Sequence, residues 1–370
     1  MASPTTSAPC RLAALGYPAD GSVRMAPVCG LPRLLSDHGI DADAMIRAQG
    51  CDPQLFTDPD NVIAFSAIGR LLVRAAELTD CAYPGLVLGR EGGLEVSGAV
   101  GRAVRSAPDV GTALRFLSLY LHLHDRGSVP YVWTDRHLGM FGYTLNCPEI
   151  TGSDHIYDGA MAIARNMLRE LAGPTWRAKE VRLFRDAPAD LAPFREHFRA
   201  PLRFRAEQAA IVFPAADLKR PCVGADADSF ARALSDLESL DAESGATLAD
   251  KVHRVLLSLF VTGVNCGGAT ADRAMIARLF ALHPRTLNRR LRAEGTNFAA
   301  VLTRARFDIA RELLRDTRLP VHDIALLLGY AGTGPFTHAF RRWSGTTAAR
   351  WRESCRPVQA EVPSGSGHAR

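Results

Sequence analysis

The sequence predicts an α+β N-terminal domain followed by an all-α C-terminal domain, in which a linker helix joins two helix-turn-helix motifs. Apolar residues recur at helical spacing along most of the chain, whereas strand-like runs are confined to residues 129–213. Near the C-terminus, residues 275–291 and 321–340 share one layout. In each copy, a short apolar helix with a small Ala precedes a tight turn and a second helix. The length of 370 residues suits two domains.

Charge is distributed unevenly between these two predicted domains. Residues 251–356 contain 18 Lys and Arg against 7 Asp and Glu, a net charge of +11. The whole chain has a net charge of +5, so the remainder has −6. A basic C-terminal third on an acidic remainder is typical of a nucleic-acid-binding domain joined to another unit. A merely solvated basic face is the alternative.

Composition and cysteine spacing argue against several classes of protein. No run of about 18 apolar residues occurs, which predicts that no segment spans a membrane. Residues 1–10 lack the basic and apolar segments of a secretion signal, so we expect a cytoplasmic, nucleoid-associated protein. The eight cysteines are scattered without a CxxC pair, which argues against a zinc ribbon or a redox dithiol. A thiol sensor stays open as an alternative.

The N-terminal region is expected to begin with helices and to add strands later. Asp41 is a suitable N-cap for a helix over Ala42–Ala48, and Asp109 for a helix that follows it. The other expected helices cover residues 31–40, 61–78, 96–106, 110–124, 150–171 and 190–198, with a turn-rich passage at 84–93. The expected strands are a hairpin at 129–134 and 138–146, a strand at 178–185, and a second pair at 202–205 and 210–213.

Domain boundaries follow from the composition of the segments between the periodic regions. Residues 1–25 are small and polar and are expected to be flexible, and residues 357–370 are expected to be a disordered tail. Residues 223–247 are rich in Ala, Asp, Ser and Gly, so we place the linker there, with a helix over 230–240 and a flexible connector from Glu243. This division gives domains over residues 26–222 and 248–356.

The second helix of the first motif, which spans about residues 271–294, has a surface suited to DNA. Leu287 and Leu291 are four residues apart and should face inward. The residues expected on the outer side are Arg285, Asn288, Arg289 and Arg292. Arg can bind guanine edges and phosphates, and Asn suits adenine. We therefore expect these four side chains to contact DNA.

The second motif spans about residues 319–343 and repeats the scaffold with a different outer face. Phe336 and Phe340 should be buried, and Gly329 suits a turn with positive φ. The residues expected on the outer side are Thr333, Thr337, His338, Arg341 and Arg342. The linker helix over residues 297–315 would span roughly 25–30 Å, close to the ~34 Å between successive major-groove faces. Both recognition helices could then reach one side of a duplex.

These C-terminal motifs resemble the AraC/XylS family of bacterial transcription regulators. The resemblance rests on Ala310 to Tyr330 and Phe336 to Gly345 and covers residues 251–352. The sequence departs from the family pattern at Ala281, His283, Ala348 and Gly334. Gly334 stands where a side chain often contacts a base. We therefore expect the first motif to dominate sequence reading and the second mainly to position the domain.

The region over residues 31–222 is similar to the arabinose-binding-like sensor domain of that family. Supporting passages include Gly85-Leu-Val-Leu-Gly89 and Ile211-Val-Phe-Pro214. The resemblance implies a regulator that binds double-stranded promoter DNA, a small-molecule effector and RNA polymerase, and that forms a homodimer. It does not identify the effector, so no effector-binding residues are assigned.

Other classes of function find less support in the sequence. An enzyme fused to the DNA-binding module would need a catalytic motif. The sequence contains no Gly-rich phosphate loop and no GxSxG or HExxH pattern. We therefore expect no catalytic residues and no cofactor. The histidines near the expected hairpin are interpreted as separate core or surface residues rather than metal ligands; they are His122, His124, His137 and His155. The third class of function considered is an architectural protein that binds DNA without sequence preference. Such a protein would have no evident use for the acidic N-terminal domain.

Overall fold

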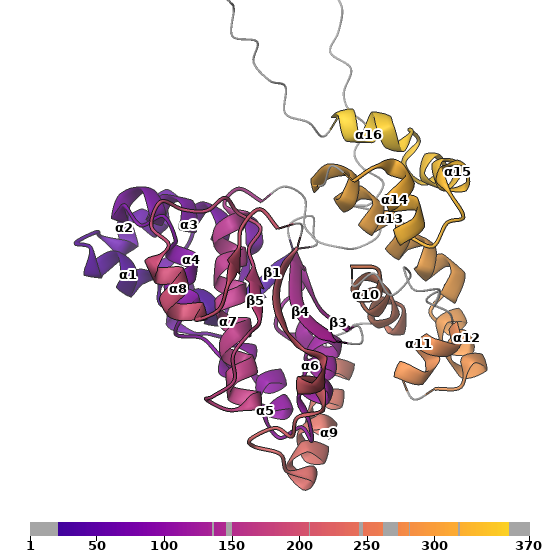
Figure 1. Ribbon diagram of the computed structural model, residues 1–370, viewed down its shortest axis with the longest axis horizontal. Coiled ribbons are helices and arrows are strands. Elements are labelled where there is room, and N and C mark those ends of the chain that lie inside the picture. Colours follow the sequence, from indigo (N-terminus) through magenta and orange to yellow (C-terminus); the bar gives the residue numbers. More distant parts are fainter. Residues whose placement is uncertain are drawn as a thin grey trace, which may run out of the picture.

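The computed structural model describes residues 21–134, 137–145, 150–206, 208–243, 247–261, 273–280, 282–316 and 319–354. N-terminal helices surround a sheet, and a cluster of C-terminal helices lies beside one edge of it (Figure 1). The fold class predicted from the sequence is confirmed. The expected tail over residues 357–370 and the connector after Glu243 lie outside the described residues.

The described part of the chain starts with a two-stranded antiparallel sheet and a group of helices. Strand β1 (Ser22–Arg24) pairs with β2 (Val62–Ala64). The flexibility expected for residues 1–25 is therefore wrong for β1, and the helix expected from residue 61 begins only at Phe65, because the preceding residues pair as a strand. The helices of this part are η2 (Ala26–Val28), α1 (Leu31–Asp37), α2 (Ala42–Ala48), η3 (Pro53–Thr57) and α3 (Phe65–Thr79).

A second helical group packs around the long helix α7 (Ser153–Ala172). The passage expected to be turn-rich instead contains helix α4 (Pro84–Gly89), which packs closely on α7. Its glycines permit this approach, since a Cβ at Gly85 would overlap the backbone of His155. The other members are η4 (Leu94–Ser97), α5 (Ala99–Arg105), α6 (Val110–Tyr120), η5 (Leu121–Leu123) and α8 (Ala192–Phe198).

The main sheet has five strands in the order β3-β4-β7-β5-β6. The expected hairpin is confirmed as β3 (Ser128–Thr134) and β4 (Leu138–Leu145). The second expected pair is wrong. Strand β7 (Ala209–Pro214) lies between β4 and β5 (Glu180–Arg182), while β6 (Leu202–Arg203) pairs in parallel with β5 at the edge. The reason is burial, because the continuous apolar run of β7 suits a central strand.

Two helical segments connect the sheet to the C-terminal helices. After η6 (Ala215–Lys219), helix α9 (Ala227–Glu243) packs on α5 and buries Leu237 in the N-terminal core. Helix α10 (Leu248–Val261) begins the C-terminal cluster, with Thr247 and Asp250 as reciprocal caps. Helix α10 also contacts β3 and α6, so the two parts of the chain touch (Figure 1).

The C-terminal cluster is all-α, as predicted. Its helices are α10, α11 (Arg273–Leu279), α12 (Pro284–Ala293), α13 (Phe298–Asp316), α14 (Val321–Leu327), α15 (Thr333–Ser344) and α16 (Ala348–Ser354). Phe336 and Phe340 are fully buried, as are Leu287 and Leu291, which confirms the predicted inner faces. Gly329 has φ of 75°, as its turn position requires. Within the described residues, no helix is both long and apolar enough to cross a membrane.

Candidate functional site

Helix α12 has a defined start and a fixed orientation. Pro284 occupies its first turn, and the His283 ring Nδ1 accepts a hydrogen bond from the Arg285 backbone N–H at 3.3 Å. His283 therefore caps the helix, although the family pattern more often has a Ser there. At the other end the chain turns at Gly295, with φ of 75°. Because Leu287 and Leu291 are buried against the core, the opposite side must face solvent.

The predicted DNA-contacting residues of α12 lie together on this outer side. Arg285, Arg289 and Arg292 are exposed, and Asn288 is half-buried at the flank. Within the described chain these three guanidinium groups form no ion pair, so their charge remains available to a phosphate or a base edge. The sequence interpretation omitted Arg290, which is also exposed on α12, at the flank of this face.

Helix α15 presents a more neutral surface. Thr333, His338, Arg341 and Arg342 are exposed, whereas Thr337 is half-buried beside the core. A Cβ added at Gly334 would meet nothing within 4 Å, so this position lies on an open surface and contributes only backbone to it. The two arginines stand in the last turn, where they also interact favourably with the helix C-terminus.

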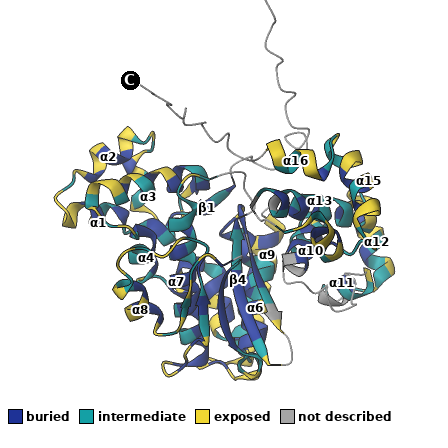
Figure 2. Ribbon diagram, turned by 45° about the horizontal axis from the view of Figure 1, so that its top comes forward, coloured by how far each residue is buried: buried dark blue, intermediate teal, exposed yellow. Residues whose placement is uncertain are grey.

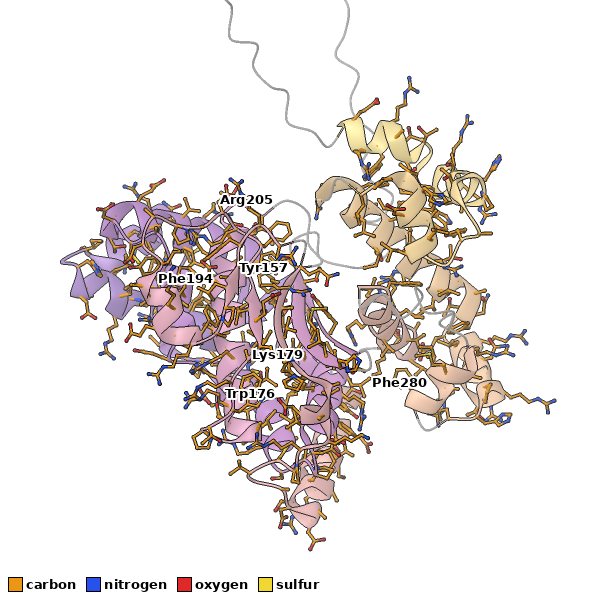
Figure 3. All side chains as sticks on the ribbon, in the orientation of Figure 1. Tyr157, Trp176, Lys179, Phe194, Arg205 and Phe280 are labelled. Atoms are coloured by element: carbon orange, nitrogen blue, oxygen red, sulfur yellow. The ribbon has the colours of Figure 1, made fainter. Side chains whose placement is uncertain are left out.

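The two recognition helices lie on one side of the C-terminal cluster. Figures 1 and 2 place α12 and α15 at its outer side, away from the sheet, with exposed residues along both. Figure 3 shows nitrogen-tipped side chains projecting outward from this side. Helix α13, with 19 residues, lies between them and is about 28 Å long. This length is close to one helical turn of DNA, roughly 34 Å.

The N-terminal domain contains a cavity of about 110 Å³ between the sheet and the helices α3, α6 and α7. Its walls are mainly apolar side chains, including Phe65, Leu117, Phe141 and Met167. A few polar residues also line it, namely Ser97, His124, Asp125, Tyr143 and His155. Apart from the neighbours His124 and Asp125, these residues are far apart in the sequence, and packing brings them together. The sequence drew attention to His124 and His155, but no local pattern predicted that they line a cavity.

The histidines singled out in the sequence have separate surroundings. His124 and His155 line the cavity, His137 is exposed, and His122 bonds through Nε2 to Asp241 at 2.7 Å. Burial, with the Arg24 guanidinium nearby, lowers the pKa of His124 to about 4, so its ring is neutral at pH 7. Among the described residues, no group of three or more His, Cys, Asp or Glu is arranged to hold a metal ion.

The described cysteines have the chemistry of structural thiols. Cys29, Cys51, Cys81 and Cys222 are free, and burial raises the pKa of each thiol, that of Cys222 to about 11. A raised pKa reduces the thiolate fraction, which is the reactive form. These four residues therefore give no support to the thiol-sensor alternative.

Comparison with known proteins matches both parts of the chain. Residues 39–222 match the arabinose-binding domain found at the N-terminus of AraC transcription regulators, and residues 276–354 match a helix-turn-helix domain family. The HTH-type transcriptional regulator VirS of Mycobacterium tuberculosis is 31% identical over 333 residues, which cover 89% of this chain and 96% of VirS. The ornithine utilization regulator of Pseudomonas aeruginosa is 26% identical, over 91% of this chain and 99% of its own.

Among solved structures, the chain is similar to the transcriptional regulator CdpR from Pseudomonas aeruginosa. The identity is 24%, the TM-score is 0.41, and the match covers 87% of this chain and 97% of CdpR. The relatives are regulators rather than enzymes, which confirms the prediction that this chain is not an enzyme.

Proposed function

Because the chain belongs to the AraC/XylS family of transcription regulators, we propose that it binds promoter DNA through α12 and α15 under the control of a small effector. The observation that carries this proposal is the outer face of α12, where three exposed arginines flank Asn288. Such a face supplies donors for guanine edges and phosphates and a side chain suited to adenine. The effector would occupy the cavity of the N-terminal domain and shift the population of DNA-binding arrangements.

The proposal assigns a role to each part of the chain. Residues 26–222 bind the effector and mediate dimerisation, residues 223–247 form the linker, and residues 248–356 bind DNA. The further partners are RNA polymerase and a second copy of this chain, and the place of action is the nucleoid in the cytoplasm. Contact between α10 and the sheet supports communication between the two domains, because a shift in the sheet would displace the first DNA-binding helix.

The Arg289→Ala variant tests the DNA-binding proposal. Arg289 lies opposite the buried Leu287 and Leu291, so its removal should leave the fold intact and take away one contact to DNA. We expect promoter binding to weaken by ~1–3 kcal/mol. The measurement is a gel-shift titration of the full-length protein on fragments that the wild type enriches from its own genomic DNA.

Arg33→Ala is the matched control, because Arg33 is an exposed arginine of the N-terminal domain and its loss changes the net charge equally. Its affinity should equal that of the wild type. If Arg289→Ala binds the enriched fragments as tightly as Arg33→Ala does, α12 does not read the promoter and the assignment is wrong.

A further inference from the structure

The cavity of the N-terminal domain has unsatisfied polar atoms in an otherwise apolar wall. Ser97 and His124 are 1% and 7% exposed. In the part of the chain that the structure describes, neither the Ser97 Oγ nor the His124 Nδ1 has a hydrogen-bond partner. Both side chains line the cavity. A buried polar group without a partner is costly, so these atoms are poised to bond to a guest molecule.

The two atoms come from segments that meet at β1. The backbone N–H of Arg24 donates to the His124 carbonyl oxygen at 3.0 Å. On the other side, a Cβ at Gly98, next to Ser97, would meet the Arg24 guanidinium. Ser97 and His124 therefore both lie near Arg24, the first on the side of its guanidinium and the second on the side of its backbone. A polar group on a guest molecule can bond to either side chain.

Among the remaining polar residues of the wall, the His155 Nδ1 likewise has no hydrogen-bond partner in the described chain, and burial lowers the pKa of this ring to about 4, so it is neutral at pH 7. Asp125 and Tyr143, in contrast, are already engaged. The Asp125 carboxylate accepts from the Gly127 backbone N–H at 2.9 Å, from the Tyr143 hydroxyl at 2.7 Å and from the Ser128 hydroxyl. It is thus not free to pair with a cation. Among the described residues that line the cavity there is no Lys or Arg, and the Arg24 guanidinium near Gly98 is already paired with Asp60, so a carboxylate or phosphate would gain little counter-charge.

The volume of the cavity and its apolar walls limit the size and the polarity of the bound molecule. A volume of about 110 Å³ is on the scale of the roughly 150 Å³ apolar cavity that binds benzene in another protein. Phe65, Leu117 and Phe141 offer it an apolar surface. A sugar carries several hydroxyl groups, and most of them would lose their bonds to water without replacement here.

We infer that the effector is an uncharged, mainly apolar molecule of about the size of one substituted ring, with one hydrogen-bonding group facing Ser97 and His124. The inference rests on the proposed function, because it specifies the ligand of the same domain. It excludes both a free sugar and a dibasic amino acid, although the matched domain family is named for arabinose and one relative for ornithine utilisation.

Binding of four probes to the full-length protein tests this inference. The probes are phenol, benzene, L-arabinose and L-ornithine, and the measurements are calorimetric titration and the shift in Tm with probe concentration. Phenol and benzene differ only in the hydroxyl group. We expect phenol to bind about three- to tenfold more tightly than benzene, and the other two probes not to bind. Tighter binding of arabinose or ornithine, or no binding of phenol, overturns the inference.

Two variants locate the binding. Ser97→Ala should remove most of the preference for phenol over benzene and keep benzene binding, whereas Ala164→Leu adds an isopropyl group at the wall and should weaken both ligands. Ser118→Ala is the control, because the Ser118 hydroxyl donates to the Leu114 carbonyl oxygen and does not line the cavity. Equal binding of phenol to Ser97→Ala and to wild type would place the hydroxyl elsewhere and overturn the inference.

The effect of the probes on DNA affinity separates this inference from the proposed function. Phenol binding that leaves DNA affinity unchanged would support the ligand class and contradict effector control through this cavity. A change in DNA affinity caused by arabinose or ornithine, without one caused by phenol, would support effector control and overturn the ligand class.

Discussion

His283 shows at the scale of one residue how a departure from a sequence pattern is accommodated. Its ring Nδ1 caps the first turn of α12, a role that a Ser or Asp side chain more often fills. Asp41 and Asp109 cap their helices as the sequence predicts, through bonds of 2.9 Å and 2.7 Å to the backbone N–H three residues later. These contacts are local, so the sequence alone is sufficient to anticipate them.

Buried histidines give the N-terminal domain a predictable dependence on pH. Burial, with Arg165 close by, lowers the pKa of His197 to about 4, and His124 has a similar value for a similar reason. In the unfolded chain a histidine titrates near ~6.5. Between these values the unfolded state binds the proton and the folded state does not. The free energy of unfolding should therefore fall as pH decreases from about 6.5 toward 4, by up to about 1.4 kcal/mol per pH unit for each group.

The His197→Gln variant should make this dependence shallower, because one buried imidazole no longer titrates. Urea unfolding at pH 7.5 and at pH 5.5 measures the difference. His338→Gln is the matched control, since His338 is exposed on α15. Parallel pH dependences for His197→Gln and wild type would show that the buried ring does not contribute.

At the scale of elements, local patterns predicted the helices well and the strand pairing poorly. Helical periodicity and caps lie within one segment, so α2, α6 and α7 are near their expected positions. Strand partners are distant in sequence, and the insertion of β7 between β4 and β5 depends on which strand is most buried. Helix α4 was missed because its glycines resemble turn residues, whereas they are required for close packing on α7.

The outer face of α12 and the N-terminal cavity also differ in how far the sequence alone predicts them. The outer face of α12 follows from the spacing of two buried leucines, and its residues lie where the sequence placed them. The cavity could not be anticipated, because its wall combines residues from Val23 to Met167. A residue such as Ser97 acquires significance only after packing has removed its hydrogen-bond partners.

The contrast between α12 and α15 predicts unequal reading of the two halves of a binding site. Helix α12 offers Asn288 and several arginines, whereas α15 offers Gly334, two threonines and His338 before its terminal arginines. We expect base substitutions in the half-site of α12 to cost ~1–3 kcal/mol each and those in the half-site of α15 to cost less. Competition gel shifts with a scanned operator measure this. Equal stringency in the two half-sites would refute the asymmetry.

Across the whole molecule, a buried ionic group joins the two domains. The Asp241 carboxylate of α9 accepts from His122 of η5 at 2.7 Å and pairs with Lys251 of α10. Both His122 and Asp241 are almost fully buried. Burial alone would raise the pKa of Asp241, but its bonds to His122 and Lys251 outweigh this effect and lower the pKa below the ordinary value. The ion pair is therefore present at neutral pH and is lost only in acid.

The Asp241→Asn variant should loosen the contact between the domains. The amide keeps the shape of the carboxylate but removes the charge that pairs with Lys251, and the remaining half-buried cation is then poorly compensated. Hydrogen exchange of the backbone amides in α10 should become about tenfold faster, while that in α12 and α15 should change little. Promoter affinity of the variant should also respond less to any ligand that fills the N-terminal cavity, because the cavity wall includes Leu121 of η5.

Asp308→Asn is the matched control for this prediction. Asp308 pairs with His253 at 2.8 Å, in the same kind of bond, but it joins α10 to α13 inside the C-terminal cluster. Its loss should speed exchange in α13 as well as in α10 and should leave the response to a cavity ligand intact. Identical exchange patterns in the two variants would show that Asp241 merely stabilises α10. A response to ligand that survives Asp241→Asn would show that the signal passes instead through the contact of α10 with β3.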